Sequence, residues 1–141
     1  MTTRALLIED HAVFLGILLR FFKEELSEFV VSGFARTAEY GLALAGELRP
    51  DVVTVDLMLP DMSGLDLIGR LRRLLPQTGI VVVTQHDDES FRVAARQAGA
   101  DAFVCKDHLP VELPHALRRA ASRGGTRETP HTSTEPVKEH P

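Results

Sequence analysis

The stretch DVVTVDLMLPDMSG, from Asp51 to Gly64, joins a short apolar run directly to a carboxylate and then to a turn. Its β-branched residues Val52–Val55 are typical of a buried strand. Asp56 follows at once, and Pro60 and Gly64 then interrupt the apolar pattern, as residues that favour turns do. A buried strand gains no stability from ending on a charged side chain, so the pattern indicates that Asp56 has a chemical task at the strand end.

Apolar runs of this kind alternate with segments of helical periodicity along most of the chain. The runs that predict strands are Ala5–Ile8, Phe29–Phe34, Val52–Val55, Ile80–Val83 and Ala102–Cys105. The segments that predict helices are 12–25, 38–49, 64–75, 89–98 and 110–122. This alternation predicts an α/β fold, a doubly wound five-stranded parallel sheet with helices on both faces.

The composition predicts one soluble, cytoplasmic domain, residues 1–122, and a disordered polar tail, residues 123–141, which has almost no apolar side chains. The formal net charge of −4 gives no basic footprint for nucleic acid, so we expect no specific DNA binding by this chain. No apolar run approaches the ~18 residues of a membrane span, and the N-terminal stretch is too short for a signal peptide. Cys105 is the single cysteine, which excludes an internal disulfide or a zinc site of several thiolates.

Polar side chains with reactive groups follow four of the five predicted strands. Glu9 and Asp10 follow the first strand, Asp56 the third, Thr84 the fourth and Lys106 the fifth. The carboxyl ends of parallel strands meet at one edge of a sheet, and ligands bind there. Asp10 taken alone is also explained as a cap of the next helix, but capping does not explain the whole set.

The chemistry of this set predicts a phosphoryl-transfer site. Several carboxylates at one point repel one another, and Mg²⁺ commonly binds one or two carboxylates together with phosphate oxygens and water. A lysine ammonium and a threonine hydroxyl can hold phosphoryl oxygens, and an aspartate can accept the group as an acyl phosphate. Such a transfer depends mainly on positioning and on charge neutralisation.

Four motifs resemble those of the response-regulator receiver domain. They are LLIEDH, VDLMLPDMSG, VVVTQH and AGADAFVCKD, and the likeness covers about residues 4–122. The resemblance implies the flavodoxin-like strand order 2-1-3-4-5. It further implies a two-component signalling protein that takes a phosphoryl group from a histidine kinase or a histidine phosphotransfer protein and then switches an output surface. A homodimer is compatible with the resemblance. The resemblance implies no enzyme activity beyond the protein's own phosphorylation and dephosphorylation.

The resemblance also assigns roles to single residues. Asp56 is the implied phosphoacceptor. Asp10, Asp56 and the backbone carbonyl of Met58 are the implied Mg²⁺ ligands, and Glu9 is expected to act through water or from behind these ligands.

Further roles implied by the resemblance concern the phosphoryl group and the response to it. Thr84 and Lys106 would bind the phosphoryl group, and Thr84 and Phe103 would form the switch. The segments TQHDDESF and CKDHLP are most similar to receivers that precede a helix-turn-helix domain, so a truncated receiver of a DNA-binding transcriptional regulator is one alternative. Another is an aspartate-based, Mg²⁺-dependent phosphatase, but that class needs a second aspartate where this chain has Met58.

The first predicted helix, HAVFLGILLRFFKEEL, has an apolar arc wider than one sheet face requires. The surplus is explained either by a neighbouring helix or by an exposed contact surface. Our hypothesis is that Leu15, Leu19 and Leu26 contribute to a surface for docking or dimerisation, because receivers commonly meet their phosphodonor with this helix.

Overall fold

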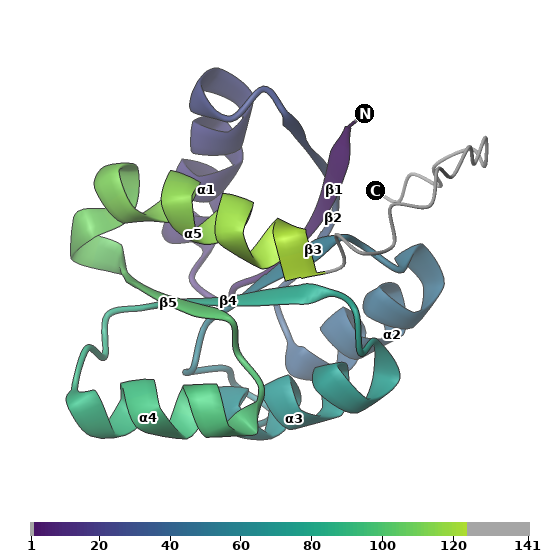
Figure 1. Cartoon of the computed structure of the whole chain (residues 1–141), viewed down its shortest axis with the longest axis vertical. Helices are drawn as coiled ribbons and strands as arrows, with labels where there is room; N and C mark the ends of the chain where they lie inside the picture. The colour runs from purple at the N-terminus through teal and green to yellow at the C-terminus, as the bar shows by residue number, and fades with distance from the viewer. Residues whose placement is uncertain (1, 124–141) are drawn as a thin grey trace.

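A computed structural model describes residues 2–123 of the chain (Figure 1). Its strands are β1 Thr3–Ile8, β2 Phe29–Ala35, β3 Val52–Val55, β4 Gly79–Thr84 and β5 Ala102–Cys105. Its helices are α1 Ala12–Glu25, α2 Ala38–Leu48, α3 Gly64–Leu74, α4 Glu89–Ala98 and α5 Leu109–Ala121, with a 3₁₀ turn, η1 Lys106–His108, before α5. Each predicted strand and helix is present, and its ends are shifted by at most one or two residues.

The predicted polar tail lies almost entirely outside the described residues, because positions 124–141 are not among them. Its first residue is described. Arg123 donates hydrogen bonds to the carbonyl of Pro76 at 3.0 Å and to the carboxylate of Asp101 at 2.6 Å. The described part of the chain therefore extends one residue past the predicted boundary, and the disorder predicted for the rest of the tail concerns residues outside the described range.

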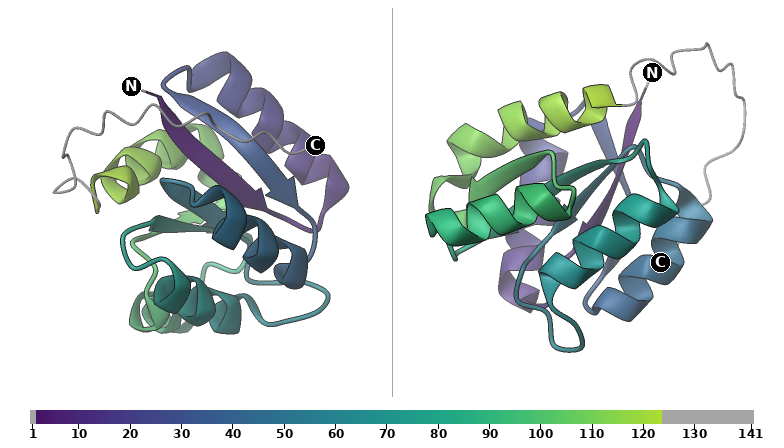
Figure 2. Two further views of the ribbon diagram at one scale, coloured as in Figure 1. Left: turned by 90° about the vertical axis from the view of Figure 1, so that its right-hand side faces the viewer. Right: turned by 60° about the horizontal axis from the view of Figure 1, so that its bottom comes forward.

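The strands form one sheet in the order β2-β1-β3-β4-β5, and all its strand pairs are parallel, as predicted. Helices α1 and α5 lie on one face, and α2, α3 and α4 lie on the other (Figure 2). Both faces are thus buried, which explains why the strands are apolar at almost every position rather than at every second one.

Each face of the sheet has its own hydrophobic core. Along β1, Leu6 and Ile8 join the core beneath α2, α3 and α4, whereas Ala5 and Leu7 join the core beneath α1 and α5. This division follows from the alternation of side chains on a strand. No helix within residues 2–123 is both long and apolar enough to cross a membrane.

Helix α1 buries most of the side that was expected to be a docking surface. Leu15 is only 6% exposed, Leu26 is fully buried, and Leu19 is half-buried against the core shared with α5. The prediction of a contact surface is therefore wrong for Leu15 and Leu26, because the core beneath α1 and α5 covers this part of the apolar arc, and for the half-buried Leu19 it stays a prediction. The exposed apolar residues of α1 are Val13 and Ile17, at 69% and 49%.

Candidate functional site

The carboxyl edge of the sheet brings an ammonium group between two carboxylates that are distant in sequence. Lys106, directly after β5, places its Nζ 3.0 Å from Oδ2 of Asp56 and 3.1 Å from Oε2 of Glu9. Glu9 and Asp56 directly follow β1 and β3, which are neighbours in the sheet. All three side chains are largely buried, with 11%, 8% and 1% of the Lys106, Asp56 and Glu9 side chains exposed.

The loop after β3 fixes the direction of the Asp56 side chain. The backbone N–H of Asp56 donates to the carbonyl of Ile8 at 3.2 Å, and the N–H of Met58 donates to Oδ1 of Asp56 at 3.1 Å. Gly64 donates its N–H to the carbonyl of Leu57 at 2.9 Å and closes the loop. A Cβ at Gly64 would lie 2.6 Å from the carbonyl oxygen of Asp56, so the close approach requires glycine here.

The two buried carboxylates carry more negative charge than one ammonium neutralises. Burial raises the pKa of the Glu9 carboxyl to about 7, and the nearby charge of Asp56 is the second cause. The Lys106 ammonium and the His11 N–H, which donates to Oε2 of Glu9 at 3.0 Å, oppose this rise only in part. The site therefore has an electrostatic reason to attract a further cation.

Asp10, the third acidic residue, follows Glu9 in the sequence, and its side chain is half-buried. Within residues 2–123 its carboxylate has no hydrogen-bond or ion-pair partner, while its backbone carbonyl accepts two hydrogen bonds from Arg36, at 2.9 and 3.2 Å. The described part of the chain contains no group of three carboxylate, imidazole or thiol side chains placed together for a metal. Mg²⁺ prefers oxygen ligands, keeps several bound waters and therefore needs only a few ligands from the protein. The carboxylate oxygens at this edge of the sheet fit that requirement.

The two residues of the predicted switch lie on β4 and β5. Thr84 is fully buried, and its hydroxyl accepts a hydrogen bond from the N–H of His86 at 3.3 Å. Phe103 is half-buried, and the guanidinium of Arg92 lies 4.6 Å from the centre of its ring. Whether these two residues move together stays a prediction.

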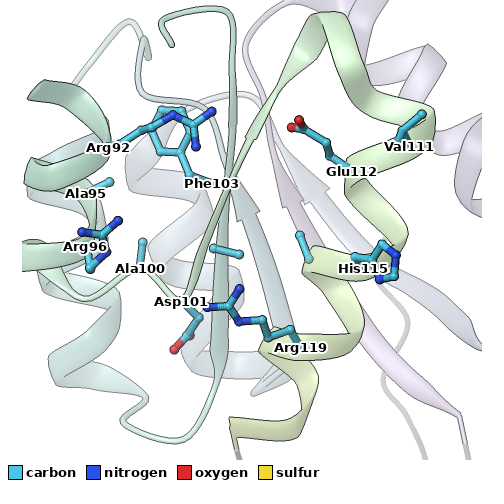
Figure 3. A pocket seen from close by; sticks show the side chains of 12 residues that line it. Arg92, Ala95, Arg96, Ala100, Asp101, Phe103, Val111, Glu112, His115 and Arg119 are labelled. Carbon is cyan, nitrogen blue, oxygen red and sulfur yellow. The ribbon is translucent and has the colours of Figure 1, made fainter. Parts of the chain in front are cut away.

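A cleft of about 390 Å³ lies between α4, β5 and α5. Figure 3 shows Arg92 and Phe103 on one wall and Glu112 and His115 on the other. The Glu112 carboxylate accepts a hydrogen bond from the backbone N–H of Cys105 at 3.3 Å, next to Lys106 in sequence. Sequence reasoning did not find this cleft, because its walls come from separate elements whose spacing has no local signal.

Sequence reasoning also missed an aromatic residue at the site. The Nζ of Lys106 lies 4.3 Å from the centre of the Phe14 ring on α1. In the sequence Phe14 is one of many apolar residues in an amphipathic helix, and nothing in the pattern separates it from ordinary core.

Comparisons with known proteins identify the family of this chain. The model of the response regulator receiver domain matches residues 5–118. The uncharacterized transcriptional regulatory protein YhcZ of Bacillus subtilis is 34% identical over 137 residues, which cover 94% of this chain and 62% of that protein. The nitrate/nitrite response regulator protein NarL of Escherichia coli K12 is 36% identical over 120 residues, which cover 83% of this chain and 54% of that protein.

A solved structure of similar fold contains a modified aspartate. It is a response regulator protein from Burkholderia pseudomallei with a phosphorylated aspartic acid, a calcium ion and citrate. Its TM-score to this chain is 0.74 at 32% sequence identity, over 90% of this chain and 73% of that one.

The chain spans less than two thirds of the length of both curated regulators, so the matched part is the receiver-sized part of each. Fold, strand order and family model agree over nearly the whole described range. The chain belongs to the response regulator receiver domain family, the phosphoacceptor regulatory domain of two-component systems.

Proposed function

We propose that Asp56 accepts a phosphoryl group from a histidine kinase or a histidine phosphotransfer protein. The observation that carries this proposal is the buried contact between Lys106 and Asp56, at 3.0 Å, within an acidic pair at the carboxyl edge of the sheet. An ammonium in this position neutralises the charge of the nucleophile and of an incoming phosphoryl oxygen alike.

In the proposed transfer, a carboxylate oxygen of Asp56 forms a bond to phosphorus. The bond between phosphorus and the donor's nitrogen, or oxygen for acetyl phosphate, breaks, and the leaving group keeps the electron pair. The product is an acyl phosphate on Asp56. Lys106 would then pair with a phosphoryl oxygen, and the hydroxyl of Thr84 would donate a hydrogen bond to another.

The proposed Mg²⁺ ligands are the carboxylates of Asp10 and Asp56 and the backbone carbonyl of Met58. Bound Mg²⁺ would neutralise the negative charge that phosphoryl transfer concentrates at the site. Glu9 would act through water, because its buried carboxylate is already engaged by His11 and Lys106. The calcium ion and phosphorylated aspartate of the Burkholderia protein support this assignment by analogy.

We propose that the response to phosphorylation is expressed at the cleft between α4 and α5. Phe103 belongs to the wall of this cleft and carries Arg92 on its ring, so a change in the Phe103 rotamer would move a charge at the surface. Thr84 and Phe103 lie on neighbouring strands, with Thr84 at the end of β4.

Intact-mass spectrometry after incubation with acetyl phosphate and Mg²⁺ tests the proposal. We expect the wild-type chain to gain one phosphoryl mass, and we expect Asp56→Ala to gain none. Asp66→Ala, which removes an exposed aspartate from α3, is the matched control and should be labelled normally. Labelling of the Asp56→Ala protein, or equal labelling in excess chelator, would refute the assignment of the acceptor or of the metal site. Release of phosphate over many turnovers from a phosphate monoester, rather than from acetyl phosphate, would instead favour the phosphatase alternative.

A further inference from the structure

The ammonium of Lys106 is contacted on three sides by groups from three different segments of the chain. Two sides are the carboxylates of Glu9 and Asp56, at 3.1 and 3.0 Å. The third is the face of the Phe14 ring, whose centre lies 4.3 Å from Nζ. An ammonium has three N–H groups, and two carboxylates account for two of them. The ring therefore covers the side of the ammonium that water would otherwise occupy.

The segment that places the Phe14 ring also holds Glu9. His11 donates its backbone N–H to Oε2 of Glu9 at 3.0 Å, and its Nδ1 accepts the backbone N–H of Phe14 at 3.4 Å as the cap of α1. The start of α1 is thus tied to the acidic pair through one residue. Phe14 is half-buried against the core beneath α1 and α5, which limits its freedom to move away.

We propose that Phe14 is a positioning residue that holds the Lys106 ammonium against Asp56. This inference rests on the proposed function of Asp56. The ring face carries partial negative charge and attracts a cation more strongly where the cation is largely buried, as Lys106 is with 11% of its side chain exposed. Leucine at position 14 would keep the apolar contact but lose this attraction, and the long lysine side chain would regain alternative rotamers.

The rate of labelling by acetyl phosphate at saturating Mg²⁺ measures the effect. We expect Phe14→Leu to lower the rate constant about three- to tenfold, the range that a partly desolvated cation–π contact predicts. Phe14→Tyr keeps the aromatic face and should restore most of the rate. Phe21→Leu is the matched control, because Phe21 is also a half-buried phenylalanine of α1 in the same core. It should lose stability to a similar extent without slowing the reaction.

A double-mutant cycle separates positioning from general packing. If Phe14 acts through the ammonium, Phe14→Leu should have little further effect on the rate in a Lys106→Ala background. An equal loss in both backgrounds, or an equal loss in Phe21→Leu and Phe14→Leu, would overturn the proposal. A normal rate in Phe14→Leu would do the same while leaving the role of Asp56 intact.

A readout without phosphorylation tests the contact itself. Methylene protons of Lys106 near the ring should show upfield ring-current shifts in the NMR spectrum of the metal-free wild-type and Phe14→Tyr proteins. These shifts should vanish in Phe14→Leu and persist in Phe21→Leu. Their absence from the wild-type spectrum would refute the contact. Failure of the wild type to accept phosphate, with the shifts present, would refute the proposed function and with it the role of Phe14 in that reaction.

Discussion

Replacing Glu9 by glutamine should make the metal-free protein more stable at alkaline pH. The folded structure raises the pKa of Glu9 from 4.5 to about 7, through burial first and the Asp56 charge second. Folding therefore favours the protonated carboxyl. The stabilisation is fully present below pH 4.5 and is lost as the pH rises through about 7. A shift of this size corresponds to about 3 kcal/mol above pH 7.

Glutamine is a suitable replacement because it has the shape of the protonated side chain. Its carbonyl oxygen can still accept hydrogen bonds from the His11 N–H and from Lys106. We expect the free energy of unfolding of Glu9→Gln to lie within about 1 kcal/mol of that of the wild type near pH 5 and to exceed it by about 3 kcal/mol near pH 8. Urea unfolding in excess chelator, followed by circular dichroism from about pH 5 to about pH 8, measures this difference.

Two further measurements identify the cause of the effect. Asp56→Asn removes the second cause of the shift, so the wild-type loss of stability should move to lower pH in that background. Excess Mg²⁺ should restore the stability of the wild type above pH 7 more than that of Glu9→Gln, because a bound cation offsets the buried charge. Parallel stability curves for wild type and Glu9→Gln over the whole pH range would refute the reasoning.

Two other substitutions test the packing that supports the site. Leu15→Glu should lower the free energy of unfolding measured in urea by about 3 kcal/mol or more, because Leu15 is only 6% exposed. Ile17→Glu, at a position that is 49% exposed, should lower it by less than about 1 kcal/mol. Similar small losses in both variants would support the predicted docking surface at the leucines. Gly64→Ala should cost about 2 to 4 kcal/mol and slow the labelling of Asp56, because the new methyl group would meet the backbone of Leu57 and Asp56. Gly69→Ala on the same helix meets nothing closer than 3.8 Å and should leave labelling unchanged; equal effects would contradict the role of the β3–α3 loop.

The fold was predictable from the sequence because the patterns that indicate its strands and its helices are both local. Each buried strand is a short β-branched run, and each helix has its own apolar periodicity, so strand and helix limits came within two residues. The contact between Lys106 and Asp56 spans 50 residues, yet it follows from the same pattern. Both residues come directly after strands of a parallel sheet, and the carboxyl ends of such strands share one edge.

The exposed face of α1 was not predictable in the same way. The sequence shows that the apolar arc is wide, but only the position of the core shared with α5 decides which part of it is covered. Leu15 and Leu26 are buried there, while Val13 remains 69% exposed in the same helix. The contact of Phe14 with Lys106 was hidden for a related reason. It joins a helix to the end of a distant strand, and no spacing rule connects the two.

The structure shows a connection between the proposed phosphoacceptor site at the carboxyl edge of the sheet and the cleft between α4 and α5, and no sequence motif indicates this connection. Three residues at the end of β5 connect them. Lys106 reaches Asp56, the N–H of Cys105 is held by Glu112 of α5, and Phe103 carries Arg92 of α4 on its ring. Glu112, Phe103 and Arg92 all line the cleft. The segment from Phe103 to Lys106 is therefore one continuous stretch of backbone that carries the lysine of the reactive edge at one end and contacts both walls of the cleft.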